Sequence, residues 1–371
     1  MNFISEGKVI KMSVEKNARL LNQSIIHLLW DALRINWYQP KFFRFVLRTL
    51  FFQNKAAKKR LTLTATGLQV PPFLIISITK KCNLNCHGCY AKAQERGNET
   101  DLDTNRINLL FSEAQELGIS IIMLAGGEPL LRQDVVLLTR NYPKILFPFF
   151  TNGLLINQSL LTELKKYPHL IPVISIEGQE EQTNLRRGYG IFQHLLEMFN
   201  HLKKSGIFFG VSITVTSKNF QQVTDDDFVL QLVKKGSKLF FYVEYIPVAP
   251  DTDHLVLSSE QQANISDKMA FLRKRFPALF IAFPGDEDTY GGCLASGRGF
   301  VHISPAGHLE PCPFAPFSDI NLQSLSLKDA LRSEFLEFIR SNHDKLNESK
   351  GGCALWKERE WVEFQLTEKF K

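Results

Sequence analysis

The sequence predicts an α/β protein with a helical extension before its sheet and a small α+β region after it. From residue 71 to Pro247, apolar runs of strand length alternate with amphipathic helical stretches. Alternation in units of this length predicts parallel strand pairing. Aromatic-rich helical patterns precede this part, and a polar loop follows it. We therefore expect three regions, which are residues 1–68, 69–250 and 251–371.

Two helices are expected in the first region, over 25–37 and 42–60, with Pro40 between them as a breaker. Residues 1–60 hold twelve Lys or Arg and three acidic residues, a charge of +9, so the remainder carries −3 of the total +6. A basic, aromatic helix can lie on an anionic membrane. It can equally pack its Phe face on the protein and leave its cations in solvent. The sequence leaves both interpretations open.

Six strands and five helices are expected in the second region. The strands are 73–78, 120–124, 145–150, 171–176, 208–216 and 239–246, and the helices lie near 103–117, 132–141, 158–167, 190–205 and 224–235. A further helix is expected near 258–276, and the domain boundary near 250–285.

Three cysteines follow the first strand within eight residues. Cys82, Cys86 and Cys89 have the spacing C-x3-C-x2-C, on the loop that leaves the strand's carboxyl end. Active sites of α/β barrels lie at this end. Three thiolates are one short of a closed zinc site or a fully protein-ligated 4Fe–4S cluster. The motif therefore predicts either an iron–sulfur cluster with one open iron or a zinc site completed by His87.

A second motif, Gly126-Gly127-Glu128-Pro129, follows the second strand. Its glycines let the backbone approach a ligand closely, and its carboxylate can accept hydrogen bonds from an amine. Together with the cysteine motif, this segment resembles the radical S-adenosylmethionine (SAM) superfamily.

That resemblance implies a partial (β/α)6 barrel of the TIM type, with a 4Fe–4S cluster and SAM as cofactors. It also implies reductive cleavage of SAM to a 5′-deoxyadenosyl radical, which removes a hydrogen atom from a substrate. Cys82, Cys86 and Cys89 would ligate the cluster, and the Gly-Gly-Glu-Pro segment would hold the methionyl amino group.

The resemblance assigns further positions to SAM. Gly88 stands where relatives often have an aromatic residue, so Tyr90 is expected to cover the cluster instead. Ser175 and Glu177 would contact the ribose, although relatives commonly have Asp at the latter position. The remaining assignments are Arg187 and Ser212 for the SAM carboxylate and Ile246 for the adenine. No residue is assigned to the chemical step itself.

A second cysteine set, Cys293, Cys312 and Cys353, lies in the third region. Residues 301–312 read as a β-hairpin whose Gly307 turn delivers Cys312. This arrangement resembles the SPASM or twitch domains that hold auxiliary clusters, and it implies a second 4Fe–4S cluster. Three unrelated buried thiols are the alternative. The candidates for a fourth ligand are Asp286, Glu287, Asp288, His302 and His308.

Composition constrains the surroundings of the protein. Six clustered cysteines in 371 residues favour metal binding in a reducing cytoplasm over a disulfide scaffold. Neither a signal peptide nor a bilayer-spanning apolar run is recognisable, so we expect a cytoplasmic protein, with peripheral membrane contact through residues 1–60 left open. No nucleic-acid-binding motif accompanies the charge, and no nucleic-acid partner is expected.

The partners follow from the chemistry. A low-potential cluster needs an electron donor such as flavodoxin or ferredoxin. The SPASM-like hairpin favours a peptide substrate, whereas the aromatic first region favours an isoprenoid or lipid-like small molecule. The alternative function is a non-catalytic iron–sulfur or zinc protein, which acts as an electron carrier or interaction module. Such a carrier has no use for a Gly-Gly-Glu-Pro segment.

Overall fold

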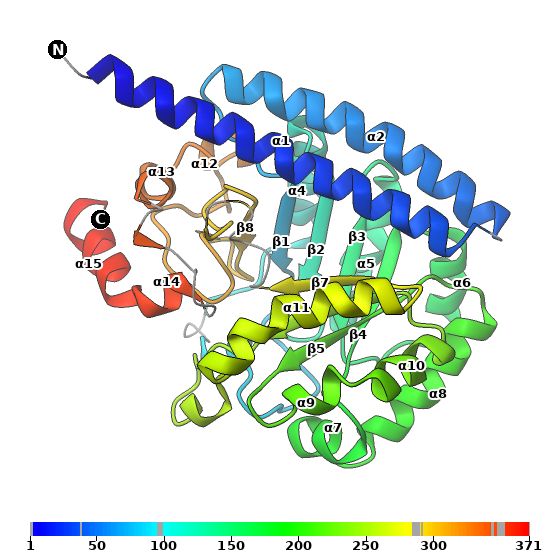
Figure 1. Ribbon diagram of the computed structural model, residues 1–371. Helices are drawn as coiled ribbons and strands as arrows, with labels where there is room; N and C mark the ends of the chain where they lie inside the picture. The colour runs from blue at the N-terminus through cyan, green and yellow to red at the C-terminus, as the bar shows by residue number, and fades with distance from the viewer. Residues whose placement is uncertain are drawn as a thin grey trace.

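The computed structural model (Figure 1) describes residues 3–37, 39–94, 99–283, 290, 292–342, 345–346 and 353–370, with side chains from residue 16 onwards. The strands are β1 Phe73–Ser77, β2 Ile121–Ala125, β3 Phe147–Thr151, β4 Leu170–Ser175, β5 Gly210–Val215, β6 Leu239–Glu244, β7 Leu279–Phe283, β8 Phe300–Ile303 and β9 Leu309–Glu310. The helices are α1 Phe3–Ile35, α2 Pro40–Ala65, α3 Tyr90–Ala93, α4 Thr104–Leu117, α5 Gln133–Leu138, α6 Gln158–Lys166, α7 Glu180–Arg187, α8 Ile191–Lys204, α9 Phe220–Val223, α10 Asp226–Lys235, α11 Ser259–Arg275, α12 Leu327–Ala330, α13 Glu334–Ser341, α14 Ala354–Lys357 and α15 Arg359–Lys369. Short 3-10 helices cover Pro129–Arg132, Thr139–Asn141 and Asp253–Leu255.

One sheet in the order β7-β6-β5-β4-β3-β2-β1-β8-β9 organises the chain. Every neighbouring pair is parallel except β8 with β9. The sheet forms a half-barrel with helices on its outside, so the predicted α/β partial barrel is confirmed. The six expected strands form close to their expected positions.

The structure adds elements that the pattern did not predict. The five-residue strand β7 continues the parallel sheet beyond β6. It was not predicted, because an apolar run this short has no clear hydrophobic period. Helix α7 is almost entirely polar and lacks an apolar stripe. The predicted boundary at residue 250 stays a prediction, but the sheet itself runs past that residue.

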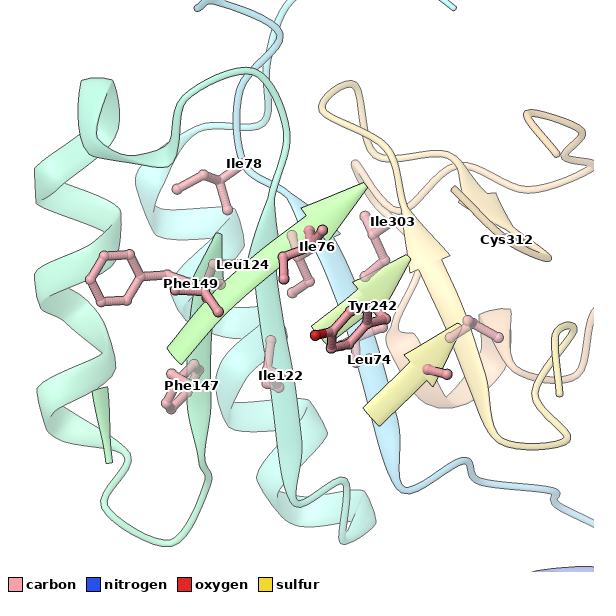
Figure 2. Packing of buried hydrophobic residues seen from close by; sticks show 14 of the residues in the cluster. Leu74, Ile76, Ile78, Ile122, Leu124, Phe147, Phe149, Tyr242, Ile303 and Cys312 are labelled. Carbon is pink, nitrogen blue, oxygen red and sulfur yellow. The ribbon is translucent and has the colours of Figure 1, made fainter. Parts of the chain in front are cut away.

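Strand alternation gives the sheet two faces with separate cores. Alternate residues such as Leu74, Ile76, Ile122 and Leu124 pack under α4, α5, α6 and α8 on the outer face, where Figure 2 shows side chains of neighbouring strands gathered. The intervening residues, among them Ile121 and Leu239, face the inside of the barrel.

Helices α1 and α2 cover the inside of the barrel. Leu29, Phe42 and Val46 are buried in one cluster with the inward residues of β2, β4, β6 and β7. Helix α1 also contacts the edge strand β7, and its Ser24 Oγ lies 2.8 Å from the hydroxyl of Tyr290. Figure 1 shows the two helices running side by side across the sheet. The predicted packing of the aromatic helices on the protein is thus observed.

The outer face of these helices differs from the inner one. Its large apolar side chains are exposed, with 48% of Trp30, 74% of Trp37 and 65% of Phe51 accessible to solvent. Arg60, which the sequence counts among the surface cations, is instead 4% exposed and donates to Gly118 O and Asn22 Oδ1. Burial lowers the pKa of Arg60 to about 10. Among the described residues, no helix is both long and apolar enough to cross a membrane.

Candidate functional site

A chamber of about 930 Å³ lies inside the barrel, and the cysteine motif forms part of its wall. Cys82, Cys86 and Cys89 line it from the loop after β1. The Gly-Gly-Glu segment lines it from the end of β2, and Cys312 lines it from beyond β9. The chain thus brings both sequence motifs to one edge, where the parallel strands end. The further predicted residues in this wall are Tyr90, Ser175, Arg187, Ser212 and Ile246.

Backbone and amide contacts hold the cysteine loop. The Leu84 N–H donates to Cys82 Sγ over 3.4 Å. The Asn152 side chain donates to Asn83 Oδ1 over 2.7 Å, which ties the end of β3 to the loop. These two asparagines were not assigned a role from the sequence. Only their positions in the sequence could have pointed to them, since Asn83 follows Cys82 and Asn152 follows the end of β3.

The thiols lie in a partly desolvated setting. Burial raises the pKa of Cys86, and the nearby Arg187 and Arg186 guanidiniums oppose that rise. Arg187 Nη1 lies 4.0 Å from Cys86 Sγ. Burial also raises the pKa of Cys82. A cationic neighbour is what a thiolate ligand needs when it is taken out of water.

The two glycines of Gly126-Gly127 serve the cysteine loop. A Cβ on Gly127 would lie 2.1 Å from the Lys81 carbonyl oxygen, and one on Gly126 would lie 2.4 Å from that of Thr79. The Gly127 and Glu128 N–H groups donate to these same two carbonyls, each over 2.8 Å. The sequence predicted close approach to a ligand. The structure shows close approach to the backbone that enters the cysteine motif.

Glu128 is 1% exposed and already well satisfied. Its Oε1 accepts from Thr151 Oγ over 2.7 Å, and its Oε2 accepts from the Asn152 N–H over 2.8 Å. Burial raises the pKa of Glu128, and these hydrogen bonds oppose the rise. A carboxylate offers about four acceptor positions. A third bond comes from the Leu130 N–H, so one position is left for a donor in the chamber, and Pro129 begins the short helix that follows.

Glu177 has a different setting from the one predicted. Its side chain is 1% exposed and is not among the chamber-lining residues. Oε1 accepts from Arg186 over 2.6 Å and from Arg187 Nε over 2.9 Å. The structure therefore gives no support to a ribose contact by Glu177. The carboxylate instead positions two guanidiniums, which both line the chamber.

Two tyrosines line the chamber beside the cysteine motif, and these are Tyr90, which the resemblance assigns to the cluster, and Tyr245. The Tyr90 ring packs edge-on against Phe314, with 5.0 Å between centroids, and burial raises its pKa. Tyr245, which follows β6, occupies the space beside Gly88, where an added Cβ would lie 2.4 Å from its hydroxyl. Tyr245 is 4% exposed, lines the chamber, and has no hydrogen-bond partner for its hydroxyl within the described structure. The sequence gave no sign of this residue beyond its place next to Ile246.

The pairing of Gly88 with Tyr245 predicts a compensating double variant. Gly88→Phe is expected to weaken SAM binding, because the new ring and Tyr245 compete for one space. Adding Tyr245→Ala to Gly88→Phe should recover part of the affinity, although Tyr245→Ala alone should lower it. Equilibrium dialysis with labelled SAM measures all four proteins. If the losses of SAM affinity in the two single variants add up to the loss in the double variant, the two positions do not share a space.

The second cysteine set is buried, with exposures of 6% for Cys293, 6% for Cys312 and 9% for Cys353. The expected hairpin is present, since β8 pairs antiparallel with β9 and Gly307 has a φ of +92°. Cys312 follows β9 (Figure 2). The Ser296 N–H donates to the Pro311 carbonyl over 3.1 Å and so joins the loops of Cys293 and Cys312.

Two of the candidate fourth ligands have other partners. His302 uses both ring nitrogens, with Ser77 Oγ at 2.8 Å and Glu310 Oε2 at 2.7 Å. His308 Nε2 lies 3.0 Å from Glu99 Oε1. The other three candidates, Asp286, Glu287 and Asp288, lie outside the described residues.

The donor set fits a cluster better than a single ion. In the part of the chain that the structure describes, no three His, Cys, Asp or Glu side chains could hold one metal ion. The backbone of His87, the proposed zinc ligand, is tied to Arg186, from whose carbonyl its N–H is 3.0 Å away. Three thiols in a chamber wall suit a 4Fe–4S cluster, because each thiolate there binds a different iron.

Comparison with known proteins adds a family match. Residues 76–229 match the family model described as the radical SAM superfamily. An AdoMet-dependent heme synthase of Methanosarcina barkeri is 25% identical over 314 residues, which cover 77% of this chain and 88% of that protein. The mycofactocin maturase MftC of Mycobacterium tuberculosis is 27% identical over 265 residues, 67% of this chain and 66% of the maturase.

Solved structures support the same fold. Streptococcus suis SuiB bound to S-adenosylmethionine superposes with a TM-score of 0.61 at 17% identity, over 79% of this chain and 73% of SuiB. At that identity the likeness concerns the fold alone. A second SuiB structure, bound to the precursor peptide SuiA, superposes with a TM-score of 0.60.

Proposed function

We propose, from the premise that this chain belongs to the radical SAM superfamily, that it is an enzyme that cleaves SAM reductively and takes a hydrogen atom from a bound substrate. Its cofactors are a 4Fe–4S cluster and SAM. One observation carries the proposal. Three cysteines and the Gly-Gly-Glu segment share one chamber wall where the parallel strands end.

The residues of this chain would divide the work among them. Cys82, Cys86 and Cys89 would hold the cluster, which, once reduced, supplies the electron that breaks a carbon–sulfur bond of SAM. Glu128 would accept from the methionyl amino group through its remaining acceptor position. Arg187, held by Glu177, would present its guanidinium to the SAM carboxylate. Ser175 and Ser212, which are paired across β4 and β5, would offer hydroxyls to the ribose and carboxylate.

We also propose an auxiliary 4Fe–4S cluster at Cys293, Cys312 and Cys353. Its support is the hairpin that carries Cys312 and the hydrogen bond between the Ser296 N–H and the Pro311 carbonyl. Cys312 lines the chamber that the first motif also lines. A cluster there would face the substrate. Electrons would come from a flavodoxin- or ferredoxin-type donor.

The substrate class has two supports that point in different directions. Two similar proteins favour a peptide, and these are the subtilosin biosynthesis protein AlbA of Bacillus subtilis and Streptococcus suis SuiB, which has been solved with a precursor peptide. The apolar interior of the barrel favours an isoprenoid or lipid-like small molecule.

Reductive SAM cleavage by the full chain tests the proposed activity. The protein is reconstituted anaerobically with iron and sulfide, reduced with dithionite, and mixed with SAM. We expect 5′-deoxyadenosine and methionine, measured by chromatography, even without substrate. A protein with a well-formed cluster that yields neither product would instead be an electron carrier.

Contact with a membrane surface is proposed for α1 and α2. Trp30, Trp37 and Phe51 are exposed among exposed cations such as Arg44 and Arg48, a combination that binds anionic lipid surfaces. Flotation with vesicles that contain anionic lipid is expected to carry the protein upward. A triple variant, Trp37→Ser with Arg44→Glu and Arg48→Glu, should stay below. Equal flotation of the two proteins would refute the contact.

A further inference from the structure

We propose that the barrel chamber binds the hydrocarbon chain of a small substrate, and that the C–H bond presented to SAM belongs to such a chain and not to a peptide. This inference rests on the proposed SAM-dependent activity, since SAM and substrate would share the chamber. It goes further because it chooses between the two substrate classes. Four features of the described chain carry it.

The first feature is a change of polarity along the barrel axis. Near the strand ends, the wall offers Ser175, Ser212 and Thr214. On β1 and β2 the register places apolar residues side by side, with Phe73 beside Ile121 and Ile75 beside Met123. Phe241 and Ile281 are also side by side, and they lie in register with Ser212. The apolar lining residues on the strands are Phe73, Ile75, Ile121, Met123, Leu146, Pro148, Phe150, Ile171, Leu239, Phe241, Val243, Leu279, Ile281 and Phe283.

The second feature is the floor that the amino-terminal helices provide. Leu29 of α1 and Phe42 and Val46 of α2 line the chamber and are buried against the strands. An open half-barrel could admit a long peptide through its side. Here α1 contacts the edge strand β7, and its Ser24 Oγ accepts a hydrogen bond from the hydroxyl of Tyr290. Helices α1 and α2 therefore cover part of the barrel interior, and an opening remains beside the exposed polar residues of α1.

The third feature is size. A five-residue strand such as β1 spans roughly 16 Å at about 3.3 Å per residue, so the wall is long in the direction of the barrel axis. A volume of about 930 Å³ is at the upper end of the range of roughly 300–1,000 Å³ for small-molecule pockets. A chamber of this size suits a small molecule. In related barrels, by contrast, side chains fill the interior in layers.

The fourth feature is the shortage of polar partners below the serines. A peptide would bring an N–H and a C=O with every residue, and burying them without partners is unfavourable. The other polar lining groups include residues near the strand ends, such as Asn152 and Glu244. They also include His27, Asp31 and Arg34 on α1, which are exposed to solvent. These three α1 residues border an opening and do not serve the interior. A hydrocarbon chain needs no such partners.

Binding of a fluorescent fatty acid, cis-parinaric acid, tests the inference on the reconstituted, SAM-bound full chain. We expect saturable binding that farnesol or hexadecanol displaces. Ile281→Trp would take up chamber space and Ile281→Glu would place a charge in an apolar wall. Each variant should therefore weaken binding of cis-parinaric acid by at least about 10-fold. Leu109→Glu, on the exposed side of α4, is the matched control and should bind like the wild type.

The competitors show which kind of hydrocarbon chain the chamber binds, and the variants test whether the chamber is the binding site. Displacement by farnesol alone indicates a prenyl chain, and displacement by hexadecanol alone indicates an acyl or alkyl chain. The inference is overturned if Ile281→Glu binds the probe as the wild type does. It is also overturned if only a capped Leu-Gly-Leu peptide or coproporphyrin displaces the probe.

SAM cleavage in the same samples separates this inference from the proposed function. A wild-type protein that forms no 5′-deoxyadenosine counts against the activity, whatever the probe does. A wild-type protein that cleaves SAM but binds no probe counts against the hydrocarbon chain alone. Leu109→Glu is the variant expected to keep uncoupled SAM cleavage, because Leu109 is 50% exposed on α4 and is not among the chamber-lining residues.

Discussion

Replacing Cys86 with Ala is expected to abolish reductive cleavage of SAM. The change removes one of three thiolates from the chamber wall and leaves Arg187 without its sulfur neighbour. Loss of a mere supporting contact to a metal ligand costs about 10–100-fold in metal affinity or activity. Loss of a ligand itself should therefore lower 5′-deoxyadenosine formation by more than about 100-fold. Iron and sulfide content and the low-temperature EPR spectrum of the reduced protein should fall with it.

Cys312→Ala is the matched comparison, since Cys312 lines the same chamber from the other cysteine set. This variant should keep uncoupled SAM cleavage and lose part of its iron and sulfide, because only the auxiliary cluster is affected. Unchanged iron content in Cys312→Ala would contradict the auxiliary cluster. Full SAM cleavage by Cys86→Ala would contradict the assignment of the first cysteine motif.

The motifs could be placed from the sequence because each occupies a strand end. Parallel strands bring their carboxyl ends to one edge, so a cysteine loop after β1 and a Gly-Gly-Glu turn after β2 had to meet. The strands themselves are apolar runs with clear bounds. The order of the strands was enough to infer that the two motifs lie together, and the structure places both in one chamber wall.

The partners of buried charges could not be predicted in the same way. Glu177 sits at a strand end, as a ligand-binding residue would. Its Oε1 nevertheless accepts from Arg186 and Arg187, and its Oε2 accepts from the Thr214 N–H. Arg60 belongs to a run of cations, yet it folds back onto Gly118 O. In both cases a three-dimensional neighbour decides the role, and that neighbour lies on another element. The local sequence pattern predicts a helix or strand from its hydrophobic period, but it does not predict which residues of other elements will contact it.

Tyr245 shows the same limit for cofactor contacts. The sequence marks a missing aromatic at Gly88, and the nearest replacement along the chain is Tyr90. The structure fills the space from β6 instead. The assignment of Tyr90 stays a prediction. Tyr245 could not be found from chain distance, because the barrel places the end of a distant strand beside the cysteine loop.

Replacing Gly127 with Ala is expected to disrupt the cysteine loop more than its small size suggests. The added Cβ would lie 2.1 Å from the Lys81 carbonyl oxygen and 2.5 Å from the carbonyl carbon. Both atoms belong to backbone that cannot rotate away as a side chain can. Overpacking of this kind costs about 1–3 kcal/mol of folding stability. The displacement falls one residue before Cys82, so cluster loading should fall together with the free energy of unfolding.

Gly206→Ala separates collision from backbone strain. Gly206 has a φ of +66° and nothing within 4 Å of an added Cβ, so Ala there brings only the left-handed strain of about 1–2 kcal/mol. Gly127 is not among the positive-φ glycines, so Ala there brings only the collision. Urea unfolding should show a loss for both variants, but iron content should fall in Gly127→Ala alone. If the two variants load iron equally, the glycines of the Gly-Gly-Glu segment do not shape the cysteine loop, and their role would have to lie in direct approach to SAM.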